Sequence, residues 1–302
     1  MTSSALSIAP PPEPPIEAAQ TAQVMRSARA LIGRMRPDDA ARILQSSGLD
    51  AAPEAVMETA QRARNAAAAR PAEIDQDNLI TGLPAELDEH VRALQASPPA
   101  APMWAEGWQV ALVDLRRVCA FQPVVFSDQA IDRVAAVDGS DLASIAAVTL
   151  PLTQGDPVPV QFDPIKQAWT VISANQNMRV LGNVALPPVS PGGTALGFVV
   201  VCWPSFMQVG CYRGRHFLRD GYHRAFGLLS RGINVVPAFV RDITAFEELL
   251  PDPRTMLPQD SYRGPRPPVL PDYLDETLSA AVQVPAQHKM IIIQALELTP
   301  VG

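Results

Sequence analysis

The chain has 302 residues, of which 47% are hydrophobic and 18% are charged, and its formal net charge is −7. This composition predicts a globular protein with a sizeable core, and the length allows one large domain or two ordinary ones. The acidic balance argues against a general nucleic-acid binder, so DNA is not an expected partner.

The cysteines are odd in number and show no CxxC spacing, so neither a disulfide framework nor a zinc site is predicted. No apolar stretch is long enough to span a bilayer, and the N-terminus lacks the positive charge and apolar run of a signal peptide. We therefore expect a cytoplasmic protein without membrane contact. All basic residues except Lys166 and Lys289 are arginine, a bias that, with abundant Ala and Pro, is typical of a GC-rich bacterial genome.

The first part of the chain is expected to be a tail followed by helices. Residues 1–16 are rich in proline and predict a disordered, Pro-rich tail. Residues 17–100 predict a helical region, in which Pro37 and Pro53 suit first helical turns. The predicted helices cover 16–35, 40–44, 53–70 and 85–96. We expect this region to pack, to oligomerise or to contact a protein partner.

A proline-rich linker over 97–102 precedes a predicted amphipathic helix over 104–121, because apolar residues recur there at helical spacing. The elements predicted next are a strand over 122–126, a helix capped by Ser127 and a short helix beginning at Ser140 or Asp141. Acidic residues near these helix starts are interpreted as capping groups in preference to metal ligands. They are Asp128, Asp132, Asp138 and Asp141.

From residue 150 the pattern changes to short apolar runs separated by Pro, Gly and Asp. Alternation of apolar and polar residues predicts mostly strands over 150–243, with one helix. The predicted strands are 158–162, 168–173, 178–184, 196–202, 206–212, 216–219 and 234–240, and the helix is 222–231. The C-terminal part predicts a helix at 242–250, an extended arm at 251–271, either helical structure or a short capped piece at 272–282, and a strand at 288–298.

The most specific stretch is FLRDGYHRAFGLLSRGINVVPAFV, residues 217–240. It predicts a strand, an Asp-Gly turn, an amphipathic helix and a buried strand. Gly221 suits a positive φ in the turn, and Gly232 suits the end of the helix. Unpaired N–H groups at a helix N-terminus favour phosphate or carboxylate.

We therefore predict an anion-binding site at residues 220–224. Its ligand-binding candidates are Gly221, Tyr222, His223 and Arg224, together with Arg213, Arg215 and Arg219 on the preceding hairpin. Asp220 is expected to orient the turn or His223. Structural alternatives stay open: His223 as a cap or partner of Asp220, Arg224 in a surface salt bridge, Tyr222 in the core, and the arginines as a solvated face.

These residues resemble the signature segment of the ParB/sulfiredoxin-like superfamily, which has a DGxHR-type turn, a helix ending in L…G and a strand containing VPV. The matching residues are Asp220, Gly221, His223, Arg224, Gly232 and Pro237. The resemblance covers residues 217–240 and extends less specifically back to Gln122. It implies a small α/β domain in which the turn and the helix N-terminus contact nucleotide phosphates.

The chain departs from that pattern in three respects. Tyr222 stands where sulfiredoxins carry a catalytic cysteine, which disfavours repair chemistry through a thiol. The GERR form of the turn and the helix-turn-helix domain of chromosome-partitioning ParB proteins are missing. Related amino-acid kinases use an acidic residue in the first half of the domain, for which Asp128 and Asp132 are candidates. No catalytic residue and no metal ligand is assigned, and whether the chain is an enzyme stays open.

The expected fold is α+β, with a helical N-terminal region followed by a ParB/sulfiredoxin-like mixed α/β domain. The expected parts are a tail (1–16), a helical region (17–100), the ParB/sulfiredoxin-like domain (101–250) and a Pro-rich arm with a C-terminal segment (251–302). The expected function is binding of a nucleotide, such as ATP or CTP with Mg, or of another phosphorylated small molecule. The alternative is a non-catalytic scaffold that keeps the fold for partner binding, with the N-terminal helices as a contact surface.

Overall fold

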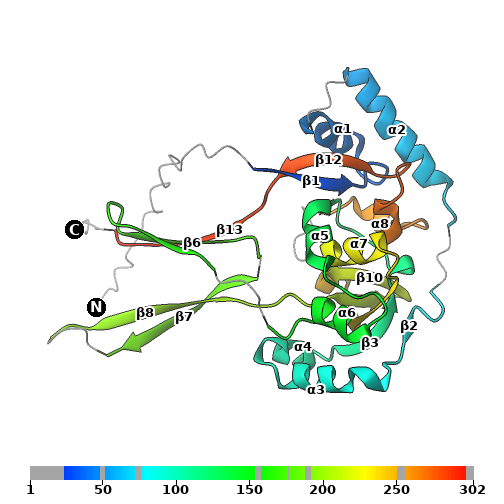
Figure 1. Ribbon diagram of the computed structural model, residues 1–302. Coiled ribbons are helices and arrows are strands. Elements are labelled where there is room, and N and C mark those ends of the chain that lie inside the picture. Colours follow the sequence, from blue (N-terminus) through cyan, green and yellow to red (C-terminus); the bar gives the residue numbers. More distant parts are fainter. Residues whose placement is uncertain are drawn as a thin grey trace, which may run out of the picture.

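The computed structural model describes residues 24–47, 52–72, 76–153, 158–175, 177–187, 192–249 and 256–296. These residues form both helices and strands, which confirms the expected α+β class. Figure 1 shows a body of helices and sheets from which two slender β arms project to one side. The predicted tail over residues 1–16 lies outside the described residues.

The elements keep one set of labels throughout. The helices are α1 (Pro37–Ser46), α2 (Pro53–Ala69), α3 (Asp88–Ala96), α4 (Ala101–Ala105), α5 (Ser127–Val134), α6 (Leu142–Thr149), α7 (Tyr222–Ser230) and α8 (Gln259–Arg263). Short 3-10 turns are η1 (Ala85–Leu87), η2 (Pro98–Ala100), η3 (Leu115–Arg117), η4 (Phe246–Leu249) and η6 (Leu270–Tyr273).

The strands of the body are β1 (Met25–Ala30), β2 (Ile80–Thr81), β3 (Gln109–Asp114), β4 (Val124–Phe126), β9 (Gln208–Tyr212), β10 (Arg215–Asp220), β11 (Val235–Asp242) and β12 (Ala280–Pro285). The strands of the arms are β5 (Val160–Asp163), β6 (Ala168–Ser173), β7 (Met178–Leu186), β8 (Ala195–Cys202) and β13 (Lys289–Gln294).

The central sheet of the body has the strand order β10-β9-β11-β3-β2. Strand β11 lies in its middle, parallel to β9 and antiparallel to β3. The large side chains of Trp108, Phe217 and Phe239 are fully buried around this sheet. Helix α6 packs against β11, and α5 packs against α7, so α7 is enclosed on most of its surface. The sheet and these helices together fix the position of the turn that precedes α7.

A second sheet, β12-β1-β4, pairs a strand from near the start of the described chain with one from near its end. Strand β1 pairs antiparallel with β12, from Met25 opposite Pro285 to Ala30 opposite Ala280. The expected helix over 16–35 is therefore wrong in its described part, since 25–30 is a strand. The small side chains of this Ala-rich stretch fit a helical face or a strand face equally well, and pairing with β12 decides between them.

The expected amphipathic helix over 104–121 is also wrong. The chain forms the short helix α4, then β3, then the turn η3. Strand β3 pairs with β11 and β2 along its two edges, and residues on both of its faces are buried or half-buried, so its apolar residues do not alternate strictly and their spacing also satisfies a helical template. The expected helical structure over 272–282 is wrong as well, because β12 begins at Ala280.

The other predicted elements are largely confirmed. Helix α2 begins at Pro53, and α6 follows Asp141, whose carboxylate caps it by accepting from the Ala143 N–H. Helix α5 is present, but the predicted cap is wrong, because Ser127 is the first helical residue, Phe126 stands at the cap position and no described side chain caps the helix. Strands β5 and β6 pair as expected, and β13 adds to them. The predicted helix over 242–250 is reduced to the single turn η4. Within residues 256–271 the expected extended arm contains α8 and the start of η6.

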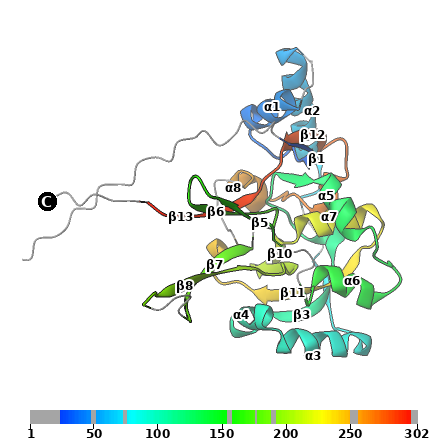
Figure 2. The same ribbon diagram turned by 60° about the vertical axis from the view of Figure 1, so that its left-hand side comes forward.

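Two β arms leave the body on the same side in both views (Figures 1 and 2). One arm is the three-stranded sheet β13-β6-β5, and the other is the two-stranded ribbon β7-β8. The ribbon contains a bulge between Val180 and Gly182. Nearly every residue of β7 is exposed, although the strand is rich in Val and Leu.

Within the described ranges, no helix is both long enough and apolar enough to cross a membrane.

Candidate functional site

The predicted turn before α7 is present. Gly221 adopts a φ of +105° and stands immediately before Tyr222, the first residue of the helix. A Cβ at Gly221 would lie 3.1 Å from the Met207 Cγ, so the backbone passes too close to the β9 side for a larger residue. Gly232, with a φ of +77°, follows the end of the helix, as its sequence position predicts.

Tyr222 belongs to the core. Its side chain is only 4% exposed, and its hydroxyl accepts a hydrogen bond of 3.0 Å from the Phe121 N–H. The ring meets Phe121 and Tyr273 edge to face. Burial raises the pKa of Tyr222 far above its ordinary value. Of the two predicted roles for Tyr222, ligand binding and packing in the core, the structure shows packing in the core.

Arg224 points inward and is 5% exposed. Its guanidinium donates to the carbonyl oxygens of Val148 (3.2 Å), Thr149 (3.4 Å) and Ser205. It also donates to the Ser205 Oγ at 3.0 Å, which in turn donates to the Asp220 carboxylate at 2.8 Å. Burial lowers the pKa of Arg224 to about 10, against the opposing charge of Asp220. Arg224 and Asp220 thus hold the start of α7 against the end of α6 and the segment before β9.

The structure does not bring the three hairpin arginines to the start of α7. Arg213 lies at the opposite end of β10, in the hairpin turn, with its guanidinium 5.2 Å from the Tyr212 ring. Arg215 donates to the carbonyl oxygen of Gly264 beyond α8 (2.8 Å). Arg219 reaches Gln208 and the Trp108 ring. Their described contacts are therefore with the hairpin itself, α8 and the central sheet.

His223 faces a different set of partners. Its ring stacks on Phe126, with ring centroids 5.5 Å apart, and its Nε2 atom is buried without a hydrogen-bond partner. Burial lowers the pKa of His223 to about 4, assisted by the positive charges of Arg133 and Arg224 and opposed by Asp128. A neutral imidazole with an unused nitrogen is therefore held beside two cations at neutral pH.

His223 belongs to a group of charged side chains that comes from three separate parts of the chain. We call this group the His223 cluster; it consists of Arg26, Asp128, Arg133, Asp220, His223 and Arg224. Arg26 on β1 pairs with Asp128 on α5 at 3.7 Å, and Arg133 interacts electrostatically with Asp220 and Arg26. Sequence reasoning missed Arg26 and Arg133, because only the packing of β1, α5 and α7 brings them to His223.

Unpaired nitrogens concentrate in this cluster. Among the described residues, five buried side-chain nitrogens have no hydrogen-bond partner, and three of them are Arg26 Nε, His223 Nε2 and Arg224 Nε. A buried donor without a partner costs about 1–3 kcal/mol, so the two arginine Nε atoms mark a place where an acceptor is expected, and His223 Nε2 adds a third donor in the tautomer that carries its proton there. The acceptor that suits two arginines and a histidine is an anion.

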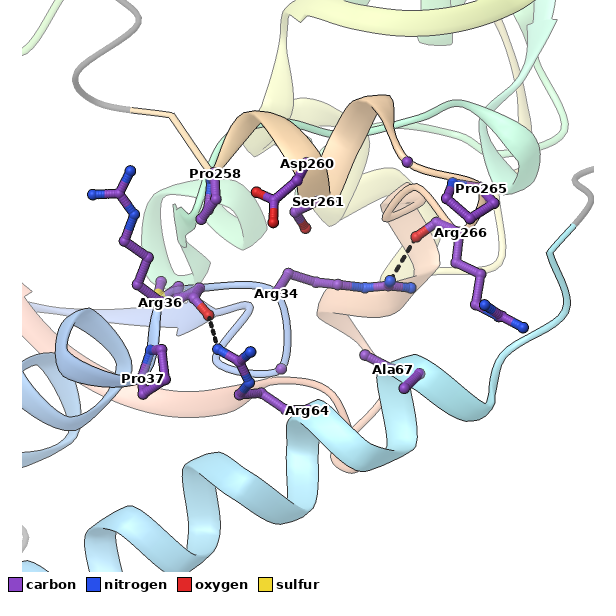
Figure 3. Close-up of a pocket in the computed structure, with 14 residues that line it drawn as sticks. Arg34, Arg36, Pro37, Arg64, Ala67, Pro258, Asp260, Ser261, Pro265 and Arg266 are labelled. Carbon is purple, nitrogen blue, oxygen red and sulfur yellow. Dashed lines mark hydrogen bonds between the residues drawn. The ribbon is translucent and has the colours of Figure 1, made fainter.

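A pocket lies elsewhere, between the β1–α1 turn, α2 and α8 (Figure 3). Its volume is about 440 Å³, and arginines dominate its polar lining. Arg34 crosses it and binds the Arg266 carbonyl oxygen (2.6 Å) and the Asp272 carboxylate (3.1 Å). Arg64 donates to the Met35 carbonyl oxygen at 3.3 Å. Arg34 thus joins the β1–α1 turn to the C-terminal part of the chain, and Arg64 joins α2 to the same turn.

Comparison of the chain with protein-family models, with curated proteins and with solved structures finds no match. Among the residues that the structure describes, no group of three or more His, Cys, Asp or Glu side chains is placed to hold a metal ion. The function must therefore be argued from the geometry of the body and its arms.

The stability of the protein is expected to fall as the pH drops from about 6.5 to about 4, with His223 contributing about 3 kcal/mol of the loss. The folded-state pKa lies below the ordinary value, so the unfolded chain binds the proton more readily in this window. Urea denaturation at pH 7 and pH 4.5 measures the loss, which His223→Gln should reduce. The same change at the exposed His288 is the control, and equal losses in all three proteins would contradict the prediction.

Proposed function

We propose that this chain has a ParB/sulfiredoxin-like α/β domain that binds a nucleotide or another phosphate-bearing ligand at the start of α7. The concentration of unpaired buried nitrogens in the His223 cluster carries the proposal. The DGYHR turn, the positive φ of Gly221 and the strand β11 with its Pro237 support the superfamily assignment. The division of the chain at residues 16, 100 and 250 is part of the same proposal.

The groups proposed to meet the phosphate are His223 and Arg26, through their unpaired nitrogens, and Arg133, through its positive charge beside them, together with the backbone N–H groups of the first turn of α7. N–H groups in a first helical turn have no partner inside the helix, and the helix dipole favours an anion there. Arg guanidinium groups add charge-assisted hydrogen bonds. Arg224 and Asp220 hold the turn in place in this arrangement, and no residue is assigned to catalysis.

Titration with ATP, CTP and ADP in the presence of Mg²⁺ is expected to show binding by the full chain in calorimetry. His223→Ala and Arg133→Ala should each weaken binding by roughly tenfold to a hundredfold, the loss of one hydrogen bond to a charged group. Arg213→Ala, which changes an exposed arginine on the hairpin turn, should leave the affinity unchanged.

Arg64→Ala tests whether the ligand binds at the His223 cluster or in the pocket of Figure 3. If Arg64→Ala abolishes binding while His223→Ala does not, the ligand occupies the arginine-lined pocket and the proposed site is wrong. If none of the three nucleotides binds, the proposal that the chain binds a nucleotide is wrong.

A second candidate is a non-catalytic scaffold that keeps this fold to bind protein partners, with the N-terminal helices as one contact surface. The exposed apolar side chains of the arms favour it, as do the internal roles of Tyr222 and Arg224. In that case substitutions in the arms change the assembly of the protein, while no nucleotide raises its melting temperature.

A further inference from the structure

The two arms carry most of the exposed apolar surface of the described chain. Fourteen of the twenty-one large hydrophobic side chains that are exposed lie on or beside the arms. They are Val160, Phe162, Ile165, Trp169, Ile172, Val180, Leu181, Val184, Leu186, Leu196, Phe198, Met290, Ile292 and Leu296. Contiguous apolar surface of this kind marks an interaction site, whereas scattered single residues do not.

The β7-β8 ribbon is apolar on both of its faces. In its antiparallel register, Val180 lies opposite Val200, and Leu196 and Phe198 follow at alternate positions on the same face. The other face carries Val199 and Val201 from β8, together with Val184 and Leu186 of β7, which lie opposite Gly197 and Ala195. Two strands without a covering layer are at best marginally stable in water, so this ribbon is expected to be covered.

The charge of the ribbon indicates what kind of surface can cover it. Arg179 is the single charged residue within β7 and β8. A surface that docks on anionic lipid needs several basic side chains, so a membrane is disfavoured. An apolar protein surface matches the chemistry of the ribbon, because covering β8 desolvates no charged side chain of that strand.

The free edge of β8 identifies a self-complementary partner. Among the residues that the structure describes, β7 and β8 pair with each other and with no other strand, so each has one edge without a described partner. The bulge between Val180 and Gly182 disturbs the edge of β7, whereas β8 runs without a bulge from Ala195 to Cys202. Two identical strands related by a two-fold axis pair antiparallel without any further requirement.

We propose that β8 pairs with β8 of a second copy of this chain, so that two ribbons form one four-stranded sheet with the β13-β6-β5 arms packed beside it. The ribbon has strands of 9 and 8 residues, and the other arm adds strands of 4, 6 and 6 residues. Together they reach the roughly 20–30 residues a side of a stable protein interface. The inference deepens the scaffold candidate and is independent of the phosphate ligand.

The test is the mass of the full chain in solution, by light scattering and sedimentation equilibrium at micromolar concentration. Wild type is expected at twice the chain mass of 32.4 kDa. Phe198→Asp combined with Val200→Asp should produce a monomer with an unchanged melting temperature of the body. Met57→Asp alters an exposed apolar residue of α2 and should leave the dimer intact.

A monomeric wild type, or a dimer that survives the β8 changes and is lost in Met57→Asp, would overturn the proposal. Amide hydrogen exchange gives a second measurement, because protection of residues 195–202 should rise with protein concentration. Protection independent of concentration would also speak against β8 pairing. Nucleotide titration of the monomeric variant keeps the two proposals apart, since ligand binding should survive the loss of the dimer.

Discussion

Replacement of Arg224 by alanine is expected to destabilise the protein by about 3–5 kcal/mol. The buried guanidinium holds the carbonyl oxygens of Val148, Thr149 and Ser205, and its removal takes a donor from each of them, although Thr149 keeps a hydrogen bond from the Met207 N–H at 2.8 Å. It also leaves a void beside the first turn of α7. The free energy of unfolding in urea at pH 7 measures the effect.

Arg219→Ala is the matched control for Arg224, because Arg219 lies nearby on β10 with a half-buried side chain and one bond to Gln208. Its loss should cost no more than about 1 kcal/mol. An Arg224→Ala protein as stable as wild type would show that the internal bonds contribute little, and would return Arg224 to the list of ligand groups.

The second large effect is expected at the buried ion pair between Arg34 and Asp272, whose side chains are 7% and 5% exposed and 3.1 Å apart. Arg34→Ala should destabilise the protein by about 3–5 kcal/mol, because it leaves the Asp272 carboxylate buried without its counter-ion. Burial already raises the pKa of Asp272, and Arg34 is the main opposing influence. Thermal and urea denaturation measure the loss.

A double variant distinguishes the charge effect from a packing effect. Arg34→Met with Asp272→Leu removes both charges and should recover much of the stability lost in Arg34→Ala. The exposed pair of Arg42 and Asp39, also 3.1 Å apart, is the control, and Arg42→Ala should change stability by less than about 1 kcal/mol. Equal losses at the buried and exposed pairs would contradict the role of burial.

The sequence predicts best where local turn chemistry decides the structure. The hairpin at Arg213–Gly214, the Asp220-Gly221 turn, α7 and β11 all form at their predicted places, because glycines and polar residues punctuate short apolar runs. Prediction from the sequence fails where a segment becomes a strand only by pairing with a segment that is distant in the chain. Residues 25–30 need β12, and β3 needs β2 and β11, and no local pattern contains those partners.

The residues of the candidate site also fall into two groups, those with a local sequence signal and those that only the tertiary fold brings to the site. His223 is found from the sequence because it lies in a recognisable turn beside a helix start. Arg26 and Arg133 are not, because β1 and α5 reach His223 only through the tertiary fold. The inward direction of Arg224 also has no local signal, since its acceptors are backbone carbonyl groups of the α6 end and of Ser205.

The pairing of β1 with β12 has a consequence for biosynthesis. Met25 must find Pro285, and Arg34 must find Asp272, so β1 waits until β12 has been synthesised. At about 5–20 residues per second, this delay is roughly 10–50 s. The central sheet and α7 are complete once β11 has been made and can form earlier. The edge of β1 that faces β4 can also pair earlier, but the edge that faces β12 stays open to wrong partners during the delay. If a chaperone is removed during translation, misfolding is therefore expected in the β12-β1-β4 sheet and not in the central sheet.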